Sequence, residues 1–258
     1  MILLNPGLLV TVGLEYSYLL AAIMFVIGLK LQSNPETARR GNLWAGAGML
    51  LPMITTLLMH KSPEGNAISF LNGSAVVVTI MVGSVIGTIM ARKVKMTAMP
   101  QMVSFFNATG GAASAIVSLI EFTKNPDQAV LVGLLGLIVG SIAFSGSMIA
   151  YGKLDGKVGD IFSKYMTWVN LLFMLVLTVV TLLILFGGYS LEIRTILVYV
   201  LLVMSLIYGV SFVMPIGGAD MPVVISLLNS LTGIAAAMAG FIYQNEAMIL
   251  GGILVGAA

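Results

Sequence analysis

Two stretches of the chain carry the residue types best suited to chemistry. Residues 99–115 read MPQMVSFFNATGGAASA and residues 221–237 read MPVVISLLNSLTGIAAA, the same frame displaced by 122 positions. The residues that recur are Met99/Met221, Pro100/Pro222, Ser104/Ser226, Asn107/Asn229, Gly111/Gly233, Ala113/Ala235 and Ala115/Ala237. An asparagine amide cannot exchange a proton near neutral pH, so a proton relay along this motif needs water or an ionisable neighbour.

The polar residues of each motif fall three or four positions apart, which places them on one face of a helix. The stripes are Pro100, Ser104, Asn107, Gly111, Ser114 and Ser118, and then Pro222, Ser226, Asn229, Gly233 and Gly240. Paired asparagines in a membrane either hold helices together, at roughly 0.6–2 kcal/mol, or line a file of water. The residues alone leave both interpretations open.

The composition requires a membrane. The chain is 59% hydrophobic and 9% charged, with a mean hydropathy of +1.07, which is too apolar for one soluble core. Several apolar runs reach the roughly 20 residues that cross a bilayer as a helix. The absence of cysteine excludes disulfides and thiolate chemistry, and a net charge of +2 does not favour nucleic acid as a partner.

We therefore predict an all-α, polytopic bundle of about nine helices in a single transmembrane domain over residues 1–258. The expected spans are 8–30, 43–60, 67–91, 99–121, 128–151, 166–187, 193–214 and 221–242, with a ninth starting near 245. Short connections favour antiparallel neighbours. Because the ninth apolar stretch stops after about 14 residues, short of a span, we expect a longer polypeptide.

The basic residues predict the orientation of the bundle. The odd-numbered connections carry nine: Lys30, Arg39, Arg40, Arg92, Lys93, Lys95, Lys153, Lys157 and Lys164. The even-numbered ones carry three: Lys61, Lys124 and Arg194. The positive-inside rule then places the amino terminus outside and the carboxyl end in the cytoplasm. Both motif helices start at the cytoplasmic side, which predicts a parallel internal repeat.

Few ionisable groups lie inside the predicted spans. Glu15 and Glu121 are intramembrane acids and thus functional candidates, although both lie near enough to the outer surface to be solvated. His60 is expected at a solvated helix end, and Asp220 is placed to cap the second motif helix. The chain has no P-loop, metal-ligand cluster or paired nucleophile and base. We therefore expect no catalytic residue, metal or bound cofactor on it.

Three blocks of sequence resemble a known family. They are RKVKMTAMP at 92–100, FSGSMIAYGKL at 144–154 and GGADMPVVISLLNS at 217–230. Together they are similar to the beta subunit of proton-translocating nicotinamide nucleotide transhydrogenases, and the likeness runs from the first connection to the end of the chain.

The resemblance implies a proton-conducting domain of the bacterial inner membrane, partnered with alpha-subunit transmembrane helices in a dimer of the alpha-beta assembly. Hydride would pass between NAD(H)-binding and NADP(H)-binding cytoplasmic domains, the latter following residue 258. The implied proton path comprises Asn107, Asn229 and Ser147, with Ser104 and Ser226 beside them on the motif faces. Asp220, Arg92 and Lys93 would couple the path to the cytoplasmic domains, and Gly111, Gly233, Gly252 and Gly256 would pack helices.

One departure from the family matters. Many members have a histidine where this chain has Asn107, so we expect the titratable group to be a histidine or carboxylate on a partner-chain helix that faces Asn107. The rival interpretation is a secondary transporter or channel subunit with helices broken in mid-membrane, for which Pro52 and Pro215 are the candidates; a purely structural scaffold is a third. The reading frame beyond Ala258 separates them, because a nucleotide-binding domain there supports the transhydrogenase.

Overall fold

The long apolar runs form helices because a backbone in lipid must satisfy its hydrogen bonds within the segment. The structure is a computed structural model that describes residues 6–59, 68–127 and 130–257. Within them lie nine α-helices and no strand. These are α1 (Pro6–Gln32), α2 (Ala38–Met59), α3 (Phe70–Lys93), α4 (Met99–Lys124), α5 (Val130–Leu154), α6 (Met166–Phe186), α7 (Leu191–Val213), α8 (Met221–Ile242) and α9 (Glu246–Ala257). The predicted all-α polytopic fold is confirmed.

Eight of these helices are long and apolar enough to cross a membrane, and α9 is shorter. Helix α2 begins at Ala38, five residues before the predicted boundary, because its first turn includes Arg39 and Arg40. Long basic side chains extend a membrane helix past its apolar run by reaching toward the polar boundary. His60 and Lys61 lie outside the described residues.

The mid-membrane breaks expected for a transporter are not found in the described helices. Helix α2 continues through Pro52. The hydroxyl of Thr55 bonds the carbonyls of Leu51 and Pro52 at 3.0 and 3.2 Å, a local adjustment that is common where proline interrupts backbone pairing in membranes. Pro215 lies in the connection after α7 has ended.

The chain divides into two compact units, residues 1–94 and 95–258. In the first unit, α1 and α2 form a hairpin. A Cβ atom added at Gly41 would lie 2.6 Å from the carbonyl oxygen of Gly28, so the two backbones meet where no side chain intervenes. The hydroxyls of Ser17 and Thr55, 2.9 Å apart, form a hydrogen bond between the two helices. No residue of α3 is buried.

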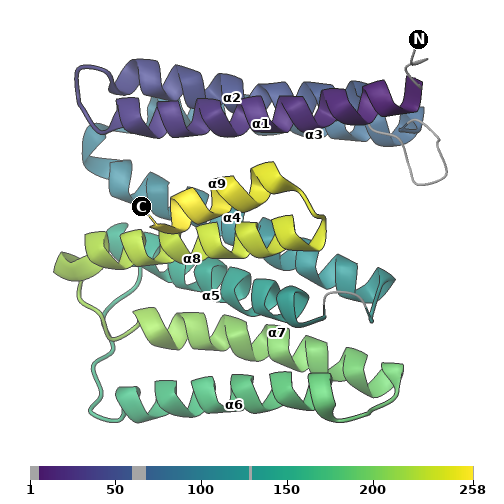
Figure 1. Ribbon diagram of the computed structural model, residues 1–258. Helices are drawn as coiled ribbons and strands as arrows, with labels where there is room; N and C mark the ends of the chain where they lie inside the picture. The colour runs from purple at the N-terminus through teal and green to yellow at the C-terminus, as the bar shows by residue number, and fades with distance from the viewer. Residues whose placement is uncertain (1–5, 60–67, 128–129, 258) are drawn as a thin grey trace. The chain divides into compact units, whose positions relative to one another are not determined.

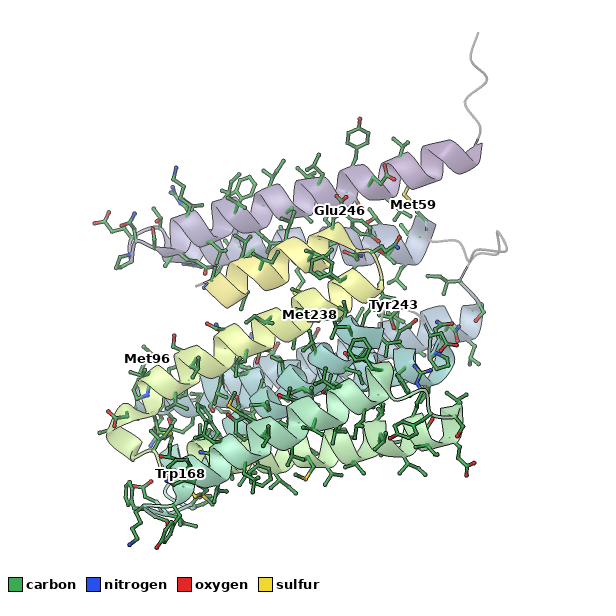
Figure 2. The ribbon with its side chains drawn as sticks, turned by 60° about the horizontal axis from the view of Figure 1, so that its bottom comes forward. Met59, Met96, Trp168, Met238, Tyr243 and Glu246 are labelled. Atoms are coloured by element: carbon green, nitrogen blue, oxygen red, sulfur yellow. The ribbon has the colours of Figure 1, made fainter. Side chains whose placement is uncertain are left out.

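The second unit is built around α5, which packs against α4 on one side, α7 on another and α8 on a third. Figure 1 shows α6 beyond α7, and α9 along α8. Figure 2 shows Met96 and Trp168 at one end of this unit and Tyr243 at the other. The helices α4, α6 and α8 therefore all begin at the same end, which also holds the end of α5.

Candidate functional site in the second unit

The first motif helix turns its polar stripe into the interior of the second unit. Ser104 is completely buried, and its hydroxyl donates to the backbone carbonyl of Ser147 on α5 at 2.8 Å. Asn107, one turn further along α4, is 8% exposed. The two polar side chains are thus enclosed by neighbouring helices, as a membrane interior requires of groups that need hydrogen-bond partners.

Asn107 links the first motif helix to the second. Its side-chain amide donates to the carbonyl of Ile225 on α8 at 3.3 Å. In an α-helix that same carbonyl accepts the backbone N–H four residues later, which here belongs to Asn229. The two asparagines of the repeated motif are therefore connected through one backbone carbonyl.

Helices α4 and α8 run side by side in the same direction. Asn107 contacts Ile225, and three residues further on, a Cβ at Gly110 would lie 2.8 Å from the methyl group of Thr232. The hydroxyl of Thr232 bonds the carbonyl of Leu228 at 3.0 Å and approaches that of Asn107 at 3.4 Å. We call the group formed by Ser104, Asn107, Ser147, Thr232 and the Ile225 carbonyl the polar seam.

The second motif helix uses its polar stripe differently. Ser226 is exposed and Asn229 is half-buried, and neither side chain hydrogen-bonds another of the described residues. Ser226 is exposed because of how the neighbouring helices pack. Helices α4 and α5 cover one side of α8 and α9 covers another, so the side with Ser226 stays open. The two copies of the motif therefore differ in what covers them, although their residues match.

Several buried polar atoms on α4 and α5 make no hydrogen bond within the described residues. They are the hydroxyls of Ser118, Ser141 and Ser147 and the side-chain oxygen of Gln101. Groups of this kind usually pair with ordered water in protein interiors. The Gln101 amide itself donates to the carbonyl of Leu154 at 3.0 Å. The interior between α4 and α5 thus offers unused acceptors and donors.

Glycines allow the close approach of these helices. A Cβ at Gly111 would lie 2.7 Å from the backbone nitrogen of Phe144 and 2.8 Å from the carbonyl of Gly140. Between α8 and α9, a Cβ at Gly233 would lie 2.8 Å from the carbonyl of Gly252. A Cβ at Gly256 has more room, with its nearest side-chain atom 3.3 Å away on Ile234. Small residues at such contacts are the usual basis of helix association in lipid.

The expected coupling residues lie at helix ends. Asp220 is exposed. It is the last residue of the short 3₁₀ turn η2 (Gly218–Asp220) and the N-cap of α8, and its side chain makes no capping hydrogen bond. Arg92 and Lys93 are exposed in the last turn of α3, in the first unit. Asp220 belongs to the second unit, whereas Arg92 and Lys93 belong to the first.

Sequence reasoning missed Lys153, which it used only as an orientation marker. This lysine, in the last turn of α5, has a side chain only 2% exposed, and its ammonium donates to the Asp160 carboxylate at 2.7 Å. It also donates to the carbonyls of Met214 and Ile216 at 2.6 and 2.8 Å. The available signal was a lysine directly after an apolar helix with an aspartate seven residues later.

At the opposite end of the unit lie Glu121 and Tyr243. The amide of Asn125 donates to the Glu121 carboxylate at 2.6 Å. Burial raises the pKa of Tyr243, which follows α8, and the nearby charge of Glu121 raises it further. The Tyr243 phenol therefore keeps its proton at neutral pH. Glu121, at the end of α4, has two polar neighbours, Asn125 and Tyr243.

These features define the class of protein. The chain is a multi-pass helical membrane protein, and its second unit encloses a polar seam between two parallel motif helices. No cluster of three metal-ligating side chains occurs among the residues that the structure describes.

Comparison with known proteins gives the family. The family model described as NAD(P) transhydrogenase beta subunit matches residues 14–258. Two curated proteins named NAD(P) transhydrogenase subunit beta, both from Rhodospirillum rubrum and one from a defined strain, are 38% identical over 254 residues. The alignments cover 94% of this chain and 52% of each relative, so the chain spans about half the length of the curated relatives it matches. The chain belongs to the NAD(P) transhydrogenase beta subunit family, which confirms the resemblance.

Proposed function

We propose that this chain is the membrane part of a proton-translocating NAD(P) transhydrogenase. It would conduct protons across the bilayer while hydride passes between NAD(H) and NADP(H) on cytoplasmic domains. Membership of the beta subunit family supports the reaction. The observation that carries the route is the buried bond from the Asn107 amide to the Ile225 carbonyl, because it joins the two motif helices in the interior of the unit.

The polar seam is suited to orienting water rather than to exchanging protons itself. Carboxamides and hydroxyls donate and accept hydrogen bonds without changing charge at neutral pH. The buried Ser147 hydroxyl has no partner among the described residues, so it is free to bond a water beside Ser104. In this proposal the protein groups hold the water file, and the proton moves along it.

The titratable group of the path is proposed to come from a partner. Asn107 is enclosed by α5 and α8, whereas the side of α8 with Ser226 and Asn229 is open. Exposed polar groups are unfavourable against lipid, which favours a protein helix on that side. We assign this place to an alpha-subunit transmembrane helix carrying a histidine or a carboxylate.

The proposed assembly follows from the same family. The chain would lie in the bacterial inner membrane, in a dimer of the alpha-beta assembly, with NAD(H)-binding and NADP(H)-binding domains on the cytoplasmic side. Exposed Asp220 at the start of α8, with Arg92 and Lys93 at the end of α3, would contact those domains.

The test is proton movement by the assembled enzyme in sealed proteoliposomes. With NADPH and an oxidised NAD analogue outside, hydride transfer should be accompanied by a change of internal pH that a protonophore abolishes. Hydride transfer at the same rate with and without the protonophore, and with no change of internal pH, would contradict the proposal. Solute-dependent currents without nucleotides would instead favour a channel or transporter.

A further inference from the structure

The ammonium group of Lys153 is a buried charge, so it needs hydrogen-bond acceptors around it. An ammonium has three N–H donors, and here each has an acceptor: the Asp160 carboxylate and the carbonyls of Met214 and Ile216, all within 2.8 Å. A buried ammonium without such partners is strongly unfavourable. The arrangement therefore fixes the position of all three acceptors relative to the end of α5.

The three acceptors belong to two different connections. Asp160 lies in the connection between α5 and α6, while Met214 and Ile216 follow α7 and lead toward α8. Carbonyls at the C-terminal end of a helix lack partners within it and favour a positive charge, which accounts for the bond to Met214, the C-cap of α7. The Ile216 carbonyl lies just beyond, in the connection. The backbone N–H of Ile161 also bonds the Met214 carbonyl, at 3.3 Å.

The segment held in this way leads directly into the second motif helix. Ile216 lies four residues before Asp220, and α8 starts at Met221, whose side chain is completely buried. Ile225 and Asn229 follow in the first turns of the same helix. A displacement of the Lys153 acceptors would therefore be passed along α8 to the carbonyl that Asn107 binds.

The far side of the connection between α5 and α6 is accessible. The Asp160 side chain is 35% exposed, and Ile161 and Phe162 are 53% and 73% exposed. In contrast, Lys153 itself is shielded. A group outside the unit can thus reach the Asp160 segment but not the lysine that connects this segment to α8.

We propose that Lys153 is a positioning residue that makes the connection between α5 and α6 and the start of α8 move as one body, so that a cytoplasmic domain pressing on the Asp160 segment shifts the polar seam. This inference rests on the proposed function. Lys153 touches neither substrate nor the proton file, and it acts through Met214, Ile216 and the start of α8.

The test compares Lys153→Met with Lys153→Arg in the assembled enzyme in proteoliposomes. The matched control is Lys157→Met, because Lys157 pairs with Asp155 at 2.6 Å but has a side chain 73% exposed. The readout is the number of protons moved per hydride transferred. Lys153→Met should lower this ratio well below that of the wild type, because hydride transfer would continue while fewer transfers move a proton. Lys153→Arg should restore much of it, and Lys157→Met should leave it unchanged.

A second measurement does not depend on the folding of Lys153→Met. The 258-residue sequence has no cysteine, so Ile161→Cys and Met214→Cys place its two thiols on either side of the backbone contact between the connections. They are introduced into an enzyme whose remaining cysteines have been replaced, and then oxidised. The locked protein should keep the wild-type ratio. Loss of the ratio on oxidation, with recovery on reduction, would overturn the proposal, because it would show that the two connections must separate.

The outcomes distinguish the two proposals. A wild-type enzyme that transfers hydride but moves no protons removes the proposed function, and the role of Lys153 falls with it. A wild-type enzyme that pumps, beside a folded Lys153→Met variant with an unchanged ratio, overturns the role of Lys153 alone.

Discussion

The side-chain amide of Asn107 donates to the backbone carbonyl of Ile225 at 3.3 Å, on the helix that carries the second copy of the motif. Asn107 thereby bonds the carbonyl that pairs with the backbone of its counterpart, Asn229. The bond joins α4 and α8 directly in the interior of the second unit.

Ser104→Ala should destabilise the bundle more than Ser226→Ala. The Ser104 hydroxyl is buried and bonded to the Ser147 carbonyl, and its loss leaves that acceptor with one partner fewer, at a cost of about 0.5–1.5 kcal/mol. Ser226 is exposed and should cost almost nothing in the isolated chain. Unfolding free energies in detergent measure both, and equal costs would contradict the description of the seam.

Gly111→Ala should be much more costly than Gly87→Ala. The new methyl group at position 111 would meet backbone atoms of α5 at 2.7 and 2.8 Å, and overpacking of this kind costs roughly 1–3 kcal/mol. At Gly87 an added Cβ meets no described atom within 4 Å, and alanine favours the helix. Thermal unfolding of the two variants makes the comparison, and a stable Gly111→Ala protein would show that α4 and α5 are further apart.

Arg194 should matter through the carbonyl of Pro126 more than through Asp127. Its guanidinium bonds that carbonyl at 2.6 Å and the carboxylate at 2.8 Å, but the Asp127 side chain is 85% exposed. Asp127→Asn should therefore cost about 0–1 kcal/mol and lose its effect in high salt. Arg194→Met should cost about 1.5–3 kcal/mol, the value of hydrogen bonds to charged groups, at low and high salt alike. Unfolding at two salt concentrations separates the two contributions.

The helices were predictable from the sequence because lipid leaves a backbone few alternatives. Apolar length and turn residues locate each helix to within a few residues, and the largest difference, at the start of α2, arises where Arg39 and Arg40 extend the helix beyond its apolar run. The family was equally predictable, since its blocks are local in sequence.

Which polar residues are buried was not predictable from the sequence, because burial depends on packing against helices that are distant in the chain. Ser104 and Ser226 occupy the same place in the motif, yet one is buried against α5 and the other is exposed. Lys153 illustrates the same limit. A lysine at a helix end is usually a solvated marker of orientation, and only the return of the chain after α7 supplies the carbonyls that bury it.

The most direct test of the proton route is the number of protons moved per hydride transferred in Asn107→Leu and Asn229→Leu enzymes, with Asn72→Leu on the exposed start of α3 as the control. Leucine has the same number of side-chain heavy atoms as asparagine but forms no hydrogen bonds. At position 107 it therefore loses the bond to the Ile225 carbonyl, and at both positions it loses the ability to bind water. Both asparagine variants should lose proton movement while uncoupled hydride exchange between nucleotides stays measurable, and the control should pump like the wild type. Unchanged pumping in both asparagine variants would contradict the assignment of the route to α4 and α8.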